Sequence, residues 1–343
     1  MKRQSNIEML RIIATMMVIM VHTAFLSLGI PKHFDNSGLL ISTLQVISVP
    51  AVNIFVLISG YFQIKAKAKN LVNYLFQILF YSISIYILWL AFGNDRLSVE
   101  GVKECFFLTE ANWFIKSYLL LFIISPLLNA FIENSNKRVY GLIVVSMLVY
   151  QTIFDFATMA DLSLRNGYST MSFVLLYLIG SYVRKYTVVG GQIKKYSISI
   201  MSLYGIILLP VLASYSGLLD SKYACKWLKY GLAYSNPLVI AVAVCYLRLF
   251  LNFNVTSKLI NWVAISSFAA FLIHANPHVI KVFIAFVRYV YTSCSLPVYF
   301  GFVISFVVWV FVASVLIDKV RMFFWRHLWN IIDKNYGRKK AEL

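Results

Sequence analysis

Charged residues are scarce in this sequence, and their scarcity excludes an ordinary soluble globular protein. Only 13% of the 343 residues are Asp, Glu, Lys or Arg, and 60% are hydrophobic, whereas soluble domains carry about 25% charged residues. The charge that is present is mostly positive, with a formal net charge of +18. No basic block is interleaved with aromatic residues in a polar segment, so we expect this excess to reflect membrane orientation, with no nucleic acid as partner.

Cysteine is also scarce, and its spacing excludes two kinds of site. No two cysteines form a CxxC pair, so neither a zinc site nor a thioredoxin-type redox site is indicated. We expect free thiols, with a disulfide among Cys105, Cys225 and Cys294 as the alternative. The fourth cysteine is Cys245.

The first apolar run lacks the A-x-A cleavage site of a signal peptide. It is also too long for one, and many similar runs follow it. We therefore interpret it as a retained first membrane span.

Long apolar runs dominate the rest of the chain. Crossing the hydrocarbon core takes about 20 mostly apolar residues in helical form. The runs predict an all-α membrane bundle of about ten transmembrane helices, of which the sixth is short and the eighth carries Pro237. The predicted spans are Glu8–Ile30, Leu39–Ile64, Leu71–Gly93, Trp113–Glu133, Val139–Met159, Thr170–Val183, Ser197–Gly217, Leu232–Leu251, Trp262–Phe286 and Val298–Ile317.

Lysine and arginine are distributed unevenly between the two sides of this bundle. The segments on the side of the N-terminus hold more than twice as many as the opposite loops. The positive-inside rule therefore predicts that both termini are cytoplasmic. No outer loop is long enough for a folded domain, and no repeat appears, so we expect one integral-membrane domain over residues 1–343. Its tail, 319–343, is predicted to be a basic cytoplasmic segment, either amphipathic or frayed.

Two ionisable residues, Arg11 and His22, interrupt the first run. They are eleven residues apart, so they share a helix face to within about 20° and lie roughly 16 Å apart along the axis. An ionisable group at the bilayer centre costs at least ~2.5 kcal/mol, so we expect both to line one wet cavity at two depths. Two structural alternatives are open: Arg11 snorkels and pairs with Glu8, and His22 is a core residue with one hydrogen bond.

Further motifs accompany this pair, and together they resemble the acyltransferase 3 family. "NIFVLISGYF" (Asn53–Phe62) is similar to its F-x-x-S-G-[FY] signature, and "NWFIKSYLLLFIISPLLN" (Asn112–Asn129) to its W-[FY]-x-x-x-Y helix ending in S-P-x-L-N. "FAAFLIHANP" (Phe268–Pro277) resembles its late L-I-H-x-x-P segment, and Arg11 and His22 resemble the pair on its first helix. The resemblance runs over the whole chain.

The resemblance implies a multi-pass bacterial enzyme of the cell (plasma or inner) membrane. It implies an O-acyltransferase that moves an acyl group, expected to be acetyl, from cytosolic acyl-CoA to a hydroxyl of a cell-surface or lipid-linked polysaccharide. His22 is then catalytic, as a general base or through transient acylation, and Arg11 orients the donor. Acetyl-CoA is the donor substrate, and no tightly bound cofactor is expected. Membrane lipids are the other partner, and the sequence is compatible with a homo-oligomer.

Depth divides the polar residues into two groups. The inner group suits the phosphates of the donor: Glu8, Arg11, Lys65, Lys67 and Lys69. The outer group contains His22, Lys116, Asp155, His274, His278 and Lys281. The residues expected to bind the acceptor are Asn53, Ser59, Trp113, Lys116, Tyr118 and His274. This layout predicts a cavity through the bundle that is basic at its cytosolic mouth.

The sequence departs from the family pattern in places. The loop "IKAKAKN" has lysines where many members carry Arg-x-x-Arg, and lysine lacks the bidentate fork of arginine. Phe271 stands where tyrosine is common, and no esterase-like domain is appended. His274 and His278 have the i,i+4 spacing of metal ligands, but no carboxylate or cysteine partner is evident nearby and Pro277 distorts that helix, so no metal is expected.

Other interpretations of the polar residues are structural. Lys116 snorkels outward, Trp113 belongs to an aromatic belt, and the pair Ser59-Gly60 serves close helix packing. The main functional alternative is a transporter or flippase of a lipid-linked sugar or acyl intermediate, for which short or Pro-broken helices are typical. A glycan polymerase is less favoured because it would usually have a large outer loop.

Overall fold

The computed structural model describes residues 3–341 except 94–95, 110–111 and 158–164. Within these ranges the chain forms helices and no strand, which confirms the all-α class. The first half contains α1 (Ser5–Val21), the π-helical turn η1 (His22–Leu26), α2 (Asn36–Ser48), α3 (Ala51–Phe62), α4 (Ala68–Phe92), α5 (Val99–Cys105), α6 (Trp113–Asn134), α7 (Lys137–Gln151) and η3 (Thr152–Ala157). The second half contains η4 (Arg165–Gly167), α8 (Thr170–Tyr186), α9 (Ile193–Tyr215), α10 (Ser221–Gly231), α11 (Pro237–Leu251), α12 (Lys258–Ala264), α13 (Ser267–His274), α14 (Pro277–Ser293) and α15 (Leu296–Ala341).

Seven helical stretches of the described chain are long and apolar enough to cross a membrane, and a bent pair brings the number to eight. The expected count of ten is not confirmed, because two predicted spans are short helices: α8 has 17 residues and α11 has 15. The predicted span Trp262–Phe286 is the bent pair, in which α14 turns by 81° from α12 and α13. Pro277 occupies the first turn of α14. Because proline has no backbone N–H and disfavours a helical conformation in the residue before it, the preceding helix cannot continue through this position.

The centre of the bundle is the crossing of α3 and α8, where the two backbones touch. A Cβ atom at Gly60 would lie 2.1 Å from the carbonyl oxygen of Tyr177, and one at Gly180 would lie 2.2 Å from that of Leu57. The Ser181 hydroxyl donates to the Gly60 carbonyl at 2.7 Å across the same contact. Gly60 of the S-G-[FY] motif therefore has the packing role that small residues have in membrane bundles.

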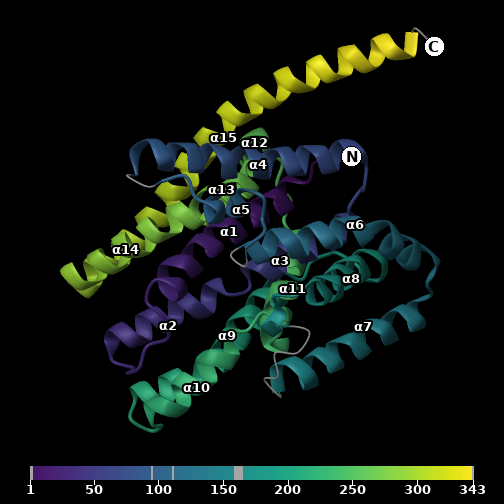
Figure 1. Ribbon diagram of the computed structural model, residues 1–343. Helices are drawn as coiled ribbons and strands as arrows, with labels where there is room; N and C mark the ends of the chain where they lie inside the picture. Colours follow the sequence, from purple (N-terminus) through teal and green to yellow (C-terminus); the bar gives the residue numbers. More distant parts are fainter. Residues whose placement is uncertain (1–2, 94–95, 110–111, 158–164, 342–343) are drawn as a thin grey trace.

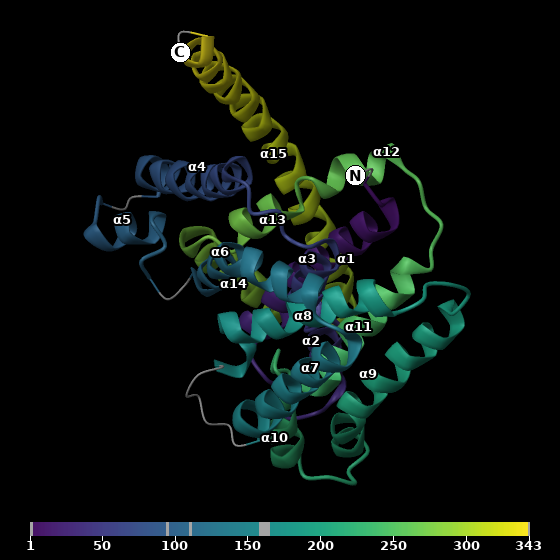
Figure 2. The same cartoon turned by 90° about the vertical axis from the view of Figure 1, so that its right-hand side faces the viewer.

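α1 runs through this centre and packs against α2, α3, α11, α12, α13 and α15 (Figures 1 and 2). The helices at the periphery have few buried residues. Of the most apolar stretch of each span, only 11% of the residues are buried in α7 with its extension, 17% in α9 and 22% in α4. Large apolar side chains cover their outward faces. Such contiguous apolar faces suit a lipid environment, so the chain is a multi-pass membrane protein.

Both ends of the chain leave the bundle at the same end (Figure 1). Arg3 donates to the carbonyl of Asn261 at 3.3 Å, and Lys319 donates to the neighbouring carbonyl of Trp262 at 2.8 Å. The segment 319–341 continues α15 as one helix that projects beyond the other helices (Figure 2). The backbone of this segment is therefore helical through Ala341. A frayed segment was one of the two expectations from the sequence, and the helix does not agree with it.

All four cysteines are free, as expected for unpaired thiols. The Cys225 thiol donates to the carbonyl of Pro31 at 2.9 Å. The alternative disulfide among Cys105, Cys225 and Cys294 is not formed.

Candidate active site

A cavity of about 530 Å³ lies in the bundle beside the C-terminal half of α1. Thr15, Val18, Val21 and His22 of the first helical stretch form one wall. The other walls are mainly apolar and aromatic, and a few amides lie among them: Gln45, Asn112, Asn166 and Asn276. An apolar cavity with a few convergent polar groups is the usual form of a small-molecule site.

His22 begins the π-helical turn that ends the first helical stretch. Its Nδ1 lies 2.9 Å from Nε2 of His274, which ends α13, and the two ring centroids are 4.9 Å apart. The other ring nitrogen of His274 contacts the carbonyl oxygen of Ala270. His22 is half-buried and lines the cavity, whereas His274 is 1% exposed and lies behind it. The structure thus brings two of the predicted site residues into direct contact from opposite ends of the chain.

Arg11 is placed differently from His22. Its guanidinium lies 3.7 Å from the Glu8 carboxylate, and Arg3 lies 3.9 Å from the same oxygen. Glu8 is buried, so two arginines surround one interior carboxylate. On α1 the cavity lining extends to Thr15, one turn from Arg11, and the Arg11 side chain is not part of it. The expected passage from Arg11 to His22 is therefore not one open cavity in this structure.

Aromatic rings fill the space between the cavity and Arg11. Phe268 lines the cavity and stacks on Tyr74 at 5.4 Å between centroids, and Tyr74 contacts Tyr118 at 5.7 Å. The Tyr118 hydroxyl shares a hydrogen bond of 3.0 Å with Ser59 and lies close enough to Arg11 to interact with it electrostatically. Tyr118 and Ser59 therefore belong to a layer behind the cavity wall.

A second hollow, of about 420 Å³, lies at the loop between α3 and α4. Lys65 and Lys67 line it together with Glu133 and Arg184, which arrive from α6 and α8. The third lysine of the loop, Lys69, is engaged elsewhere, because its ammonium lies 4.3 Å from the ring of Trp329 on α15. Two of the three predicted lysines and one arginine thus meet at one basic hollow.

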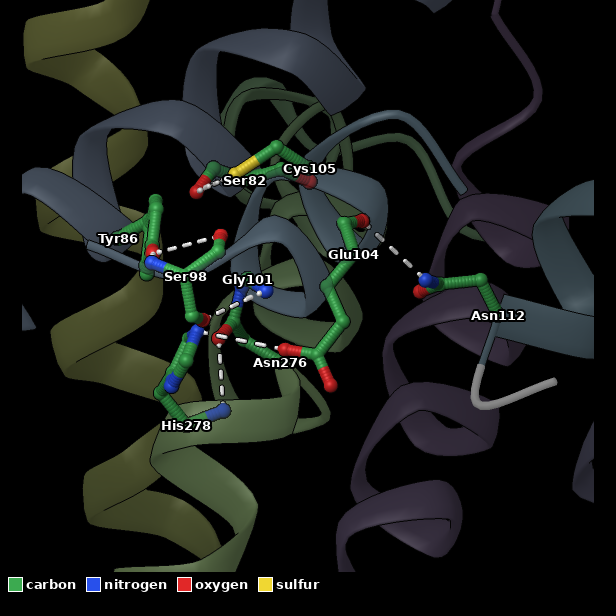
Figure 3. A network of polar contacts seen from close by, with 9 residues as sticks. All are labelled: Ser82, Tyr86, Ser98, Gly101, Glu104, Cys105, Asn112, Asn276 and His278. Atoms are coloured by element: carbon green, nitrogen blue, oxygen red, sulfur yellow. Dashed lines mark hydrogen bonds and ion pairs between the residues drawn. The ribbon is translucent and has the colours of Figure 1, made fainter. Parts of the chain in front are cut away.

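His278 belongs to a separate polar network near the cavity (Figure 3). Its Nε2 lies 3.4 Å from the Glu104 carboxylate of α5, and its ring stacks on Tyr86 and Trp89. Asn276 accepts a hydrogen bond from the His278 backbone at 3.0 Å and so caps α14. The sequence-based view that no carboxylate lies near this histidine pair was wrong, because α5 is distant in sequence and packs beside α4 and α14. The rings of His274 and His278 have different partners on either side of the helix break, and no cluster of three His, Cys, Asp or Glu side chains occurs in the described part of the chain.

Of the remaining residues predicted to bind the acceptor, one lines the cavity, one is buried and one is exposed. Trp113 lines the cavity and packs on Tyr168 with 4.4 Å between ring centroids. Asn53 is fully buried and donates to the carbonyl of Tyr234 at 3.0 Å. Lys116 is exposed and donates to the carbonyl of Thr109 at 2.9 Å, in line with its snorkelling interpretation.

Two more residues complete the predicted outer group. Lys281 is exposed on α14. The Asp155 side chain lies outside the described residues, so the structure does not place it relative to the cavity.

Three residues near the two hollows were missed by the sequence analysis. Arg184 lies in the basic last turn of α8, but nothing local shows that it reaches the loop between α3 and α4. Asn276 directly precedes a proline, which is a helix-start signal that could have been found. Glu104 carries no such signal, because its relation to His278 depends entirely on tertiary packing.

Comparison with known proteins identifies the chain at the level of a family. The model of the acyltransferase 3 family, described as an acyltransferase domain, matches residues 4–319, nearly the whole chain. No curated protein and no solved structure matches the chain significantly. With its long apolar helices and a family match over almost its full length, the chain belongs to the acyltransferase 3 family and is a membrane acyltransferase.

Proposed function

We propose that this protein transfers an acyl group, most simply acetyl, from cytosolic acetyl-CoA to a hydroxyl of a cell-surface or lipid-linked polysaccharide in the bacterial cell membrane. The observation that carries the proposal is an imidazole, His22, in the wall of a mainly apolar cavity whose other polar groups are amides, hydroxyls and the ammonium of Lys229. An imidazole beside mainly apolar walls can accept a proton from a hydroxyl group bound in the cavity, which is what transfer of an acyl group to that hydroxyl requires.

His22 acts as the general base in this proposal. It takes the proton from the sugar hydroxyl while the hydroxyl oxygen attacks the thioester carbonyl carbon. The tetrahedral intermediate then collapses: the carbon–sulfur bond breaks, and the CoA thiolate leaves and takes the proton back from His22. Transient acylation of His22 is the alternative route to the same product.

The donor nucleotide is proposed to bind at the second hollow. Lys65, Lys67 and Arg184 bring three positive charges to this hollow, next to the one carboxylate of Glu133. Arginine provides the bidentate fork for phosphate that the two lysines lack. Lys69 is a weaker candidate, since Trp329 already holds its ammonium.

The pantetheine arm must pass the aromatic layer to bring the thioester to His22. Arg11 lies on the far side of that layer and is proposed to orient the donor, with Glu8 holding its guanidinium in place. Tyr118 and Ser59 are proposed to guide the arm, and not to bind the sugar, because they lie behind the cavity wall.

The acceptor is proposed to bind at the part of the cavity lined by Trp113, Asn112 and Asn276. An aromatic face with nearby amides suits a sugar ring, which offers C–H groups on its faces and hydroxyls at its edge. Asn53 and Lys116 have backbone partners of their own and are better explained as structural.

The test is label transfer from radiolabelled acetyl-CoA to a glycan pool by the purified protein, compared with the variant His22→Ala. We expect the variant to lose about 10² to 10⁴ in rate, the usual contribution of a general base. His33→Ala is the matched control, because His33 is exposed in the loop after η1. Equal transfer by wild type and His22→Ala would refute the assignment of His22.

One observation favours a second candidate, a flippase of a lipid-linked sugar. The bent pair of α13 and α14 beside the cavity is of the kind found in transporters. The same assay separates the two, since a flippase leaves all label on CoA in the presence of acceptor. Running it in nanodiscs and in detergent also shows whether surrounding lipids or a homo-oligomer are needed.

A further inference from the structure

The contacts of His274 restrict where its protons lie. Its Nδ1 contacts the carbonyl oxygen of Ala270, and a carbonyl oxygen accepts hydrogen bonds but never donates them. Nδ1 of His274 must therefore carry a proton. Because the ring is 1% exposed, a second proton on it would place a charge in buried surroundings. The neutral ring then has its lone pair on Nε2.

The lone pair of His274 in turn determines the state of its neighbour. Nε2 of His274 lies 2.9 Å from Nδ1 of His22. Since Nε2 accepts, Nδ1 of His22 donates and carries the proton. A neutral His22 protonated at Nδ1 has its remaining lone pair on Nε2.

The position of the two rings gives this tautomer a consequence for chemistry. His22 lines the cavity, and its Nδ1 edge is turned towards His274 behind the wall. The edge of the ring left for the cavity is the one that carries Nε2. The nitrogen available to a hydroxyl group in the cavity is thus the one able to accept a proton.

We infer that His274 is a positioning residue that holds His22 in the tautomer with its proton on Nδ1, so that Nε2 faces the cavity as a base. The chain of contacts runs from the Ala270 carbonyl through His274 to His22. It links α13 to the π-helical turn after α1, and a hydrogen bond to the rear nitrogen commonly sets the reactive nitrogen of a histidine. This inference rests on the proposed function for its kinetic part, but the tautomer itself does not.

Two variants distinguish control of the His22 tautomer by His274 from a merely structural role of His274. His274→Leu removes the acceptor, so His22 is no longer obliged to keep its proton on Nδ1. His274→Gln restores an oxygen at a similar distance from the backbone, and that oxygen can accept from His22. A merely structural role for His274 predicts no relation between the tautomer of His22 and the rate.

The experiment combines ¹⁵N NMR of histidine-labelled full-length protein in nanodiscs with acetyl-transfer kinetics. Signals of His22 are assigned by their loss in His22→Ala. In wild type we expect an unprotonated Nε2 and a protonated Nδ1. In His274→Leu we expect the proton to shift towards Nε2 and kcat to fall about 10²-fold, with the KM for acetyl-CoA unchanged. His274→Gln should recover both the wild-type tautomer and most of the rate.

A protonated Nε2 in wild-type His22 overturns the inference, even where the protein transfers acetyl groups normally. A rate in His274→Leu that falls without a change of tautomer overturns it as well. Absence of transfer by wild type refutes the proposed function alone, because the NMR spectra still decide the tautomer. If His274→Leu does not fold, the tautomer of His22 in wild type and in His274→Gln still tests the inference: a protonated Nε2 in wild type overturns it.

Discussion

The backbones of α3 and α8 touch where the two helices cross, and Gly60→Ala tests the importance of this contact. The new Cβ would lie 2.1 Å from the carbonyl oxygen of Tyr177, whereas ordinary contact begins at 3.4 Å. The difference between these values means that the helices must separate by roughly 1.3 Å at this point. The atom in the way is backbone, so no side-chain rotation relieves the clash.

The magnitude follows from three contributions. Overpacking of this kind costs about 1–3 kcal/mol. Separation also weakens the hydrogen bond from Ser181 to the Gly60 carbonyl, now 2.7 Å, which is worth about 0.5–1.5 kcal/mol. Alanine regains up to about 1 kcal/mol of helix propensity over glycine. We expect a net destabilisation of about 1–3 kcal/mol.

Thermal unfolding in detergent, followed by tryptophan fluorescence, measures this effect. Gly205→Ala on α9 is the matched control: it makes the same chemical change in a helix interior, and its Cβ would have no heavy atom within 4 Å. We expect Gly60→Ala to unfold several degrees below wild type and Gly205→Ala at or above it. Equal midpoints for the two variants would refute the packing argument.

Three further predictions concern the basic hollow, the helix break and the orientation. Arg184→Ala should raise the KM for acetyl-CoA about tenfold with little change in kcat, as expected for a lost phosphate contact worth about 1.4 kcal/mol; Arg138→Ala, an exposed arginine on α7 outside the hollow, should leave it unchanged. Asn276→Ala should destabilise the protein by about 1 kcal/mol through loss of the α14 cap, and a wild-type unfolding temperature would contradict this. A membrane-impermeant maleimide should label the exposed Cys294 in intact cells. Cys105 should not react, because its burial and then the adjacent Glu104 raise the pKa of its thiol. Labelling of Cys294 only after permeabilisation would mean that the predicted orientation is reversed.

Periodicity and length were enough to predict the general architecture. The all-α class and the membrane location follow from long apolar runs, because a backbone in lipid must satisfy its hydrogen bonds within each helix. The count of spans was less predictable. α8 is buried against α3 at the centre of the bundle, and α11 packs against α3, α9 and α1. Neither helix therefore needs the length of a lipid-exposed helix, and apolar content alone does not distinguish the two cases.

The candidate site was likewise only partly predictable from the sequence. His22 was singled out from the sequence because an imidazole in an apolar helix demands an explanation. Its partner His274 on α13 was predicted to bind the acceptor, and no contact with His22 was predicted. The contact of 2.9 Å between the two rings joins residues that are 252 positions apart, and no local pattern encodes it. The same holds for Arg184 at the α3–α4 loop and for Glu104 beside His278.

By itself the sequence determined that the chain is a helical membrane protein, that it resembles acyltransferases, and that its first helix carries an arginine and a histidine on one face. Each of these depends on residues close together along the chain, or on composition. Only the tertiary structure decided that His22 meets His274, that an aromatic layer separates His22 from Arg11, and that Arg184 joins two loop lysines. The physical reason is that helix packing sets these distances, and packing depends on side chains from many helices at once.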